Sequence, residues 1–438
     1  MLGGKVDRFL MDDLVKWKNS KRRKPLILNG ARQVGKTWLL KEFGRIQFEN
    51  VAYVSFDDNP LMAAAFDEGY DIPRLITILQ AVTGERIDPS ATLIVFDEVQ
   101  ECPKALTSLK YFCENAPEYH IAAAGSLLGI LVHEGTGFPV GKVNLLDLHP
   151  LSYREFLHAT GNGGLCDIID DGDVAMIDSL ALRFTQLLRQ YYYVGGMPEA
   201  VAAFTDAGVL ADAREVQEQI LFGYERDISK HLSARETEYT LAAWKSVPAH
   251  LGQENKRFVF GHIRDGARAR DYRLAITWLA QAGIATPVRR ISKPGIPLAP
   301  YADDAIFKLF ALDVGLLSAM AGLDETSAIA GNSAFTEFKG ALTEQYVCQQ
   351  LVSDCGLAPY YWSAENSSGE IDFLVQAGAN VYPIEVKAEE NLRAKSLRAF
   401  NGRYEGMSPR RFSMSGFRDQ GWMRNIPLYA IGNPGNWV

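Results

Sequence analysis

Apolar residues in the first third of the chain gather in short runs, and the segments between these runs place apolar positions at helical spacing. A short apolar run bounded by polar residues is typical of a buried strand, and strands that alternate with helices build a parallel sheet. The pattern predicts an α/β fold, with a five-stranded parallel sheet wrapped by helices. The predicted strands are Leu26–Asn29, Val51–Phe56, Leu93–Asp97, His120–Ala124 and Val143–Leu148.

The pattern changes after residue 150. From 151 to about 230 it is helical and relatively acidic, which predicts a small helical lid. The next part predicts a helical module with a short β-wing, in which Arg268–Leu279 forms a helix and Ile284–Ile291 a strand. In a winged-helix fold this helix would present Arg268, Arg270 and Arg273 to the major groove of DNA. The alternative is a packing module whose arginines meet acidic neighbours.

Near the C-terminus, the apolar runs 371–376 and 381–387 flank Ala-Gly-Ala-Asn, which predicts a β-hairpin. If those four residues form the loop, Asp372 lies opposite Glu385, and strand alternation places Lys387 on the same face as Glu385. The predicted organisation has four parts: an α/β core over 1–150, a lid over 151–232, a winged-helix-like module over 233–330 and an α/β C-terminal domain over 331–438.

Residues 30–37 read Gly-Ala-Arg-Gln-Val-Gly-Lys-Thr, a complete phosphate-binding loop between a predicted strand and a predicted helix. In that context the loop amides and the helix N-terminus cradle an anion, the Lys36 ammonium reaches the β- and γ-phosphates, and the Thr37 hydroxyl ligates Mg²⁺. The motif predicts a bound nucleoside triphosphate. The predicted nucleotide-binding residues are Gly30, Ala31, Arg32, Gln33, Val34, Gly35, Lys36, Thr37 and Trp38.

A second motif supports hydrolysis of that nucleotide. The apolar run 92–96 ends in Asp97 and Glu98, the Walker B pattern. Asp97 would hold the water shell of Mg²⁺, and Glu98 would orient or deprotonate the attacking water. Ser126 follows the fourth strand and would sense the γ-phosphate, although an ordinary serine at a strand end is the alternative. We therefore expect Lys36, Glu98 and Ser126 to be catalytic.

The composition is that of an ordinary globular protein, with 438 residues, 47% of them hydrophobic and 22% charged. Its five cysteines are scattered, which argues against a disulfide framework or a zinc site and favours the cytoplasm. The N-terminus lacks an apolar signal core, and no apolar run approaches the length of a membrane span. We therefore expect no membrane association.

The net charge of −8 is unevenly distributed. Between residues 256 and 293, nine basic residues face two acidic ones, and between 393 and 424, eight face two. Two basic segments in an acidic chain are typical of a surface for a polyanion such as nucleic acid, with solvated surface charge as the alternative.

The predicted hairpin carries a second candidate site. Two carboxylates beside an amine can bind Mg²⁺ or Mn²⁺ and position a water, as hydrolysis of a phosphodiester requires. A preceding helix over 337–351 would add Glu344 to Asp372 and Glu385. The alternative is a cross-strand salt bridge on a solvated sheet face.

Together these motifs resemble those of the bacterial and archaeal two-part ATPases, in which an AAA-type P-loop domain precedes a C-terminal module of uncharacterised function. The segments that carry the resemblance are 29–37, 96–100, 124–126, 148–156, 195–199, 312–316, 369–373 and 383–387. An additional strand between the phosphate loop and the Walker B strand is typical of P-loop ATPases with a catalytic glutamate.

The resemblance implies ATP as the nucleotide. It also implies a C-terminal fold similar to the PD-(D/E)xK nucleases, with Glu344, Asp372 and Glu385 as metal ligands and Lys387 beside them. Where relatives show Gly-Arg, this chain has Gly-Lys at 141–142. Lys142 or Arg154 would then supply a cation to a neighbouring subunit.

The sequence thus predicts a cytosolic ATPase whose nucleotide state gates DNA binding or metal-dependent DNA cleavage. A regulatory switch ATPase that binds a protein partner, with an inactive C-terminal fold, is the alternative, and RNA in place of DNA is a third. Because AAA-type cores often assemble with one another, a homo-oligomer also stays open.

Overall fold

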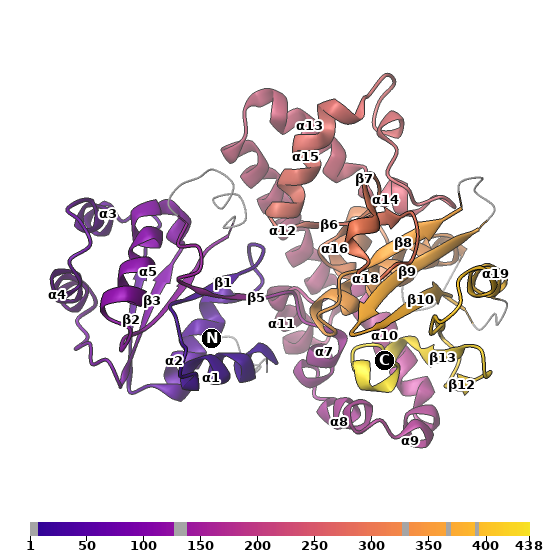
Figure 1. Ribbon diagram of the computed structural model, residues 1–438, viewed down its shortest axis with the longest axis horizontal. Helices are drawn as coiled ribbons and strands as arrows, with labels where there is room; N and C mark the ends of the chain where they lie inside the picture. The colour runs from indigo at the N-terminus through magenta and orange to yellow at the C-terminus, as the bar shows by residue number, and fades with distance from the viewer. Residues whose placement is uncertain (1–7, 127–137, 326–332, 365–368, 390–393) are drawn as a thin grey trace. The chain divides into compact units, whose positions relative to one another are not determined.

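The computed structural model describes residues 8–126, 138–325, 333–364, 369–389 and 394–438, with the side chains of 333–337 left aside (Figure 1). The chain forms two compact units. The N-terminal unit comprises 8–149 together with 281–283, and the C-terminal unit comprises 150–280 and 284–438. The predicted division into four parts stays a prediction. Among the described residues, every helix is too short or too polar to cross a membrane.

The N-terminal unit contains the predicted five-stranded parallel sheet, which is confirmed. Its strands are β1 (Leu26–Asn29), β2 (Asn50–Ser55), β3 (Thr92–Asp97), β4 (His120–Ala124) and β5 (Asn144–Asp147). They are arranged in the order β2-β3-β4-β1-β5, and each neighbouring pair is parallel. Parallel strands end at the same edge, so the residues that follow β1, β3 and β4 are brought together there.

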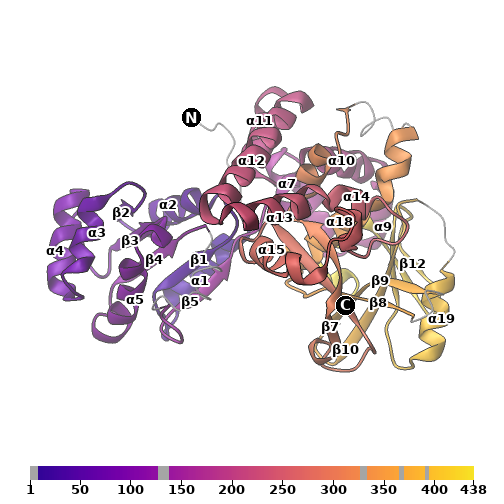
Figure 2. The ribbon, with the colours of Figure 1, turned by 90° about the horizontal axis from the view of Figure 1, so that it is seen from above.

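Helices cover both faces of this sheet. They are α1 (Leu10–Asn19), α2 (Lys36–Gln47), α3 (Pro60–Asp67), α4 (Ile72–Thr83) and α5 (Pro103–Asn115). Ile94 and Phe96 point from β3 into the core beneath α3, α4 and α5. On the other face Gly44 of α2 lies against Val51 and Leu93. Figure 2 shows α2 and α5 on opposite sides of the sheet. Burial on both faces is the reason that these strands read as continuous apolar runs.

The C-terminal unit combines helices with one mixed sheet. The helices are α7 (Tyr153–Ala159), α8 (Gly163–Asp171), α9 (Val174–Ser179), α10 (Ala181–Val194), α11 (Pro198–Ala207), α12 (Leu210–His231), α13 (Ala234–Lys245), α14 (Val247–Leu251), α15 (Ala269–Gln281), α16 (Val314–Met320), α18 (Ser333–Ser353) and α19 (Lys395–Arg403). The strands are β6 (Ala285–Ile291), β7 (Ala302–Ala311), β8 (Tyr360–Ser363), β9 (Glu370–Ala377), β10 (Asn380–Val386), β11 (Arg410–Ser413), β12 (Arg418–Asp419) and β13 (Arg424–Pro427).

The strand predicted for the β-wing, Ile284–Ile291, belongs to this larger sheet as β6. The strand order is β12-β13-β11-β10-β9-β8-β6-β7, in which β6 pairs with β7 in antiparallel and with β8 in parallel orientation. The hydrogen bonds between β6 and β8 therefore join the middle of the chain to its C-terminal part. A separate winged-helix module is not shown and stays a prediction.

The hairpin predicted near the C-terminus has the expected register. Val381 pairs with Gln376, and the pairing continues to Ile384 with Phe373. The loop is shorter than expected, because Asn380 already pairs with Ala377 and leaves two residues in the turn. The next positions along the two strands are Asp372 and Glu385.

A buried carboxylate ties distant segments of the C-terminal unit together. Asp313, directly before α16, has no solvent exposure. Its oxygens accept hydrogen bonds from the Gly196 amide at 2.6 Å, the Leu316 amide at 3.0 Å and the Gln349 side chain at 3.0 Å. Burial raises the pKa of Asp313, and these donors oppose that effect by favouring the charged form.

The glycines beside this carboxylate are required by close packing. A Cβ on Gly195 would lie 2.1 Å from an oxygen of Asp313, and one on Gly196 would lie 2.0 Å from the carbonyl oxygen of Leu151. The Gly196 carbonyl accepts from the Leu151 amide at 2.6 Å, and the Tyr191 hydroxyl donates to the Leu151 carbonyl at 2.5 Å. Three of the segments that carry the family resemblance, 148–156, 195–199 and 312–316, thus meet in one structural junction.

We predict that Asp313→Ala lowers the free energy of unfolding of the C-terminal unit by about 3 kcal/mol, because three buried donors lose their acceptor. Urea denaturation followed by tryptophan fluorescence would measure the change. Asp304→Ala is the control, since this carboxylate is 78% exposed and pairs with Arg289 at the surface. We expect the control to change stability by less than about 0.5 kcal/mol. Equal effects of the two substitutions would contradict the structural role of Asp313.

Candidate nucleotide-binding site

The phosphate-binding loop has a backbone that glycine alone accommodates at its first position. Gly30 follows β1 with φ of 154°, and a Cβ there would lie 2.4 Å from the carbonyl oxygen of Leu148. Gly35, at φ of 93°, precedes the first turn of α2. Loop and helix N-terminus therefore form a concave backbone surface with the positive end of a helix dipole, which fits a phosphate group.

Lys36 lies over this loop. Its side chain is buried, and its Nζ donates to the carbonyl oxygens of Gly30 at 2.9 Å and Ala31 at 2.8 Å. Burial lowers the pKa of Lys36 to about 8, and the nearby carboxylates Glu98 and Asp97 oppose this shift. The predicted phosphate-binding amine is thus held at the loop.

Thr37 and Asp97 meet at the carboxyl edge of the sheet. The Thr37 hydroxyl donates to Asp97 Oδ2 at 2.7 Å, and the Tyr53 hydroxyl donates to the same oxygen at 2.8 Å. A hydroxyl beside a buried carboxylate is a suitable pair of oxygen ligands for Mg²⁺, so these two residues fit the metal expected with a nucleotide. Burial and then Asp97 raise the pKa of Tyr53, which keeps its proton on the hydroxyl.

Tyr53 is a site residue that motif reading missed. It belongs to β2, and β2 pairs with β3 so that Ser55 lies opposite Asp97. Its contact with Asp97 depends on this pairing and on the direction of a long side chain. The apolar run around Tyr53 predicted a strand but did not say which strand would be its neighbour.

Glu98 is linked to Ser126 through a residue between them in space. Glu98 has a left-handed backbone with φ of 51°, which turns its side chain out of the line of β3. Gln100 donates from Nε2 to Glu98 Oε2 at 2.5 Å and lies 3.5 Å from the Ser126 hydroxyl. The candidate base and the candidate sensor are therefore close together. Their catalytic roles stay predictions, and Gln100 joins the candidates.

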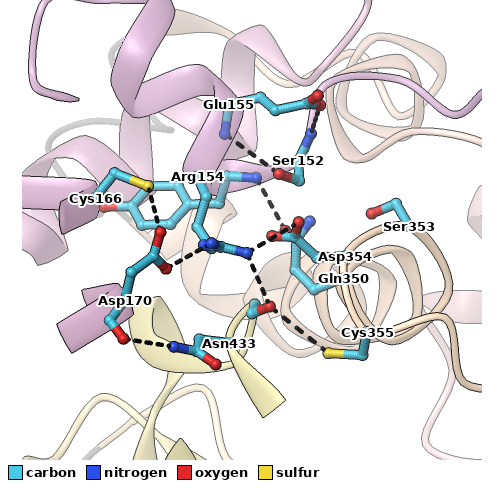
Figure 3. Close-up of polar contacts among 12 residues, drawn as sticks. Ser152, Arg154, Glu155, Cys166, Asp170, Gln350, Ser353, Asp354, Cys355 and Asn433 are labelled. Carbon is cyan, nitrogen blue, oxygen red and sulfur yellow. Dashed lines mark hydrogen bonds and ion pairs between the residues drawn. The ribbon is translucent and has the colours of Figure 1, made fainter. Parts of the chain in front are cut away.

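The two cations considered for a neighbouring subunit are both paired within the chain. Lys142 pairs with Glu114 at 2.9 Å. Figure 3 shows Arg154 between Asp170 and Asp354, at 2.5 and 3.5 Å, with a hydrogen bond of 3.4 Å to the Gly432 carbonyl. Arg154 belongs to the C-terminal unit, where it links α8, the residue that follows α18 and the backbone at Gly432.

The close approach of these groups leaves little space around Arg154. A Cβ on Gly432 would lie 2.4 Å from an oxygen of Asp354 and 2.9 Å from the Arg154 side chain. Cys166 and Cys355 border the cluster (Figure 3). Cys355 also donates to the carbonyl oxygen of Ile431 at 3.4 Å. The arrangement has the properties of a structural cross-link within the C-terminal unit.

The carboxylates of the second candidate site are bound by protein groups. Glu344 accepts from Lys256 and Lys308, and Asp372 accepts from the Val386 amide at 2.7 Å. Glu385 pairs with Lys387 at 2.9 Å. Within the described part of the chain, no three His, Cys, Asp or Glu side chains are grouped so that they could hold a metal ion. The metal role of Glu344, Asp372 and Glu385 stays a prediction. Lysines pair with Glu344 and Glu385, whereas Asp372 is bound by a backbone amide.

Acidic residues from other segments neutralise much of the first basic segment. Five of its nine basic residues form ion pairs in the described structure, and four of those pairs use acids outside the segment. The paired residues are Lys256, Arg264, Arg270, Arg289 and Arg290. Arg268 and Arg273 of the predicted DNA-reading helix are exposed, and among the described residues neither forms an ion pair.

The second basic segment is divided between surface and interior. Arg410 and Arg411 are buried, and Arg393 lies outside the described residues. The exposed members are Lys395, Arg398, Arg403, Arg418 and Arg424. Arg398 lies over the ring of Trp422 at 5.0 Å, which combines positive charge with an aromatic surface.

Family models match three parts of the chain. Residues 22–157 match an AAA domain, 185–327 match a domain of unknown function (DUF8612), and 339–420 match a second domain of unknown function (DUF4143). With the parallel sheet, the phosphate-binding loop and the Walker B carboxylates, the first match defines a P-loop ATPase domain of the AAA type. The two other matches assign no activity, and the nuclease-like character of the C-terminal part is not shown.

No curated protein matches the chain. Among solved structures, the Walker-type ATPase PABY2304 of Pyrococcus abyssi matches at 13% identity, over 72% of this chain and 96% of that one, with a TM-score of 0.44. The Aeropyrum pernix ORC1 protein in complex with DNA matches at 12%, over 72% and 90%, with a TM-score of 0.28. Cdc6p of Pyrobaculum aerophilum matches at 13%, over 78% and 97%, with a TM-score of 0.27. At these scores the likenesses carry no argument about function.

We predict that Tyr53→Phe lowers the affinity for Mg²⁺ in nucleotide binding by about tenfold. Groups that orient a metal-binding carboxylate typically contribute that much to metal affinity. Titration of Mg²⁺ against a fluorescent ATP analogue would measure the shift. Tyr70→Phe is the control, because Tyr70 stacks on Tyr111 at 4.4 Å in the same unit. An unchanged Mg²⁺ titration in Tyr53→Phe would show that the hydrogen bond does not position Asp97.

Proposed function

We propose that the chain binds and hydrolyses ATP in its N-terminal unit and couples nucleotide state to DNA binding by its C-terminal unit. The observation that carries this proposal is the group formed by Lys36, Thr37, Asp97 and Glu98 at one edge of the parallel sheet. A protein that binds ATP without hydrolysing it would also need the loop and Lys36, so these two features alone do not indicate hydrolysis. The adjacent Glu98, held by Gln100, supports hydrolysis.

In this proposal the loop amides and Lys36 bind the triphosphate. Thr37 and Asp97 would hold Mg²⁺, which neutralises phosphate charge when it is bound. Glu98 accepts a proton from the attacking water, and Gln100 fixes its orientation. Ser126, near Gln100, would respond to the presence of the terminal phosphate. A nucleotide-dependent contact at Ser126 or Gln100 would thus change how Glu98 is held.

The exposed face of α15 supports DNA as the partner. Arg270, Arg273, Leu274 and Thr277 are exposed and follow one another at helical spacing on one face of the helix. The opposite face packs into the unit through residues such as Tyr272. A helix with one buried face and one exposed face containing arginines has the form that enters a major groove.

A regulatory switch that binds a protein partner is the second candidate. It is favoured by the ion pairs of the first basic segment, because they leave fewer free cations for phosphates than the sequence suggested. The two candidates differ in salt dependence. Phosphate contacts release counterions, so DNA binding weakens steeply as salt increases, whereas a largely apolar protein interface does not.

We predict that Lys36→Ala abolishes nucleotide binding, whereas Glu98→Gln retains ATP but loses turnover by about 10²- to 10⁴-fold. Binding of a fluorescent ATP analogue and steady-state phosphate release would measure the two effects. Glu101→Gln is the control, since it removes a charge from the same short turn without touching the loop. Normal hydrolysis by Glu98→Gln would overturn the assignment of the base.

We also predict that Arg270→Ala/Arg273→Ala weakens binding to duplex DNA and lowers the slope of log K against log salt by about two, one for each lost phosphate contact. Fluorescence anisotropy with labelled duplex at several salt concentrations gives both values. Arg45→Ala/Arg86→Ala removes the same charge from the N-terminal unit and should leave the slope unchanged. An equal fall in slope for both pairs would indicate a general charge effect instead of contact through α15.

A further inference from the structure

A fully buried lysine lies among the C-terminal carboxylates. Lys308, on β7, has no solvent exposure, and its Nζ lies 2.5 Å from Glu370 Oε1 and 3.5 Å from Glu344 Oε2. Glu370 belongs to β9 and Glu344 to α18. The ring of Tyr361 on β8 lies on another side, with its centroid 5.1 Å from the ammonium. One cation thus joins three strands and a helix.

A second lysine completes the coordination of Glu344. Lys256, in the segment between α14 and α15, bonds Glu344 Oε1 while Lys308 approaches Oε2. Both oxygens of this buried carboxylate are therefore taken by ammonium groups. Asp372, two residues after Glu370 on β9, has its Oδ2 bound by the Val386 amide.

The four residues joined by these ion pairs carry no net charge. Glu344 and Glu370 supply two negative charges, and Lys256 and Lys308 supply two positive ones. Asp372 stands apart from this balance, because burial and the neighbouring Glu344 raise its pKa to about 7. Buried charges persist only when they are paired in this way. A divalent cation placed at Glu344 would lie within a few ångströms of both ammonium groups, and at that distance in a protein interior the repulsion is strong.

We propose that the ammonium of Lys308, supported by Lys256, permanently takes the position that a divalent cation would hold between Glu344 and Glu370. The C-terminal unit then needs no metal for its fold and has no metal-dependent cleavage. This inference deepens the proposed function, on which it rests for the role of the unit: DNA would be bound and not cut. It also gives Lys308 and Lys256 a role that the sequence motifs did not suggest.

The test is Mn²⁺ binding to the full chain without nucleotide, measured by electron paramagnetic resonance. A Thr37→Ala background removes one of the two expected metal ligands of the N-terminal unit and leaves Asp97 in place. We expect this protein to bind no Mn²⁺ at the C-terminal site and to lose no stability in EDTA. Lys308→Met in the same background should gain Mn²⁺ binding, and adding Glu344→Gln should remove that gain. Lys293→Met, which removes an exposed lysine of the same unit, should bind none.

Three results would overturn the inference, two from Mn²⁺ binding and one from DNA cleavage. The first is Mn²⁺ binding by the Thr37→Ala protein that disappears in Asp372→Asn or Glu344→Gln, and the second is a folded Lys308→Met variant that binds no Mn²⁺. If Lys308→Met does not fold, the first comparison decides alone. Plasmid nicking that requires Mn²⁺ and is lost in Asp372→Asn would also contradict it.

Separate assays distinguish failure of the proposed function from failure of this inference. ATP hydrolysis and anisotropy with duplex DNA in EDTA are measured on the wild-type protein from the same preparation. Absence of either activity counts against ATP-coupled DNA binding, whereas the Mn²⁺ comparison still reports on Lys308.

Discussion

The carboxylate of Asp313 holds the C-terminal unit together, because segments far apart along the chain bond to it. It accepts from Gly196 before α11, from Leu316 at the start of α16 and from Gln349 on α18. Without these donors the charge would be too costly to bury, and without the charge the donors would lack an acceptor. The position of α18 follows from this junction, and α18 in turn places Glu344 beside Lys308 and Lys256.

In the N-terminal unit, the pairing of parallel strands brings distant segments together. Its parallel strands end at the same edge of the sheet. The residues that follow β1, β3 and β4 are distant in sequence, and the strand pairing alone brings them together at that edge. Asp97 then links them, since it accepts from Thr37 and Tyr53 through one oxygen and from the Glu98 amide through the other. A buried aspartate that collects several donors thus organises each unit.

The sequence was informative where the signal is local. The loop at 30–37 and the strands around it depend on neighbouring residues, and both are seen as predicted. It was less informative where partners are remote. To identify Tyr53 as a site residue, the order of the strands must be known. To identify Gln100, the shape of the turn after β3 must be known. Lys308 and Lys256 lie 36 and 88 residues from Glu344, so the local sequence indicated a metal ligand and gave no sign of these two lysine partners. The wing strand was found, but its pairing with β8 could not be predicted from local alternation.

That pairing of β6 with β8 also affects how the protein is made. The sheet of the C-terminal unit contains strands from residue 285 to residue 427, and its interior strands cannot be completed until the last of them has been synthesised. The five strands of the N-terminal unit lie within the first 147 residues and are available much earlier. Domains generally fold as units during synthesis, N-terminal first, and contacts between distant residues form slowly. The sheet of the N-terminal unit can therefore assemble on the ribosome before the apolar strands of the C-terminal sheet have pairing partners. The chain is most exposed to aggregation while those strands are unpaired.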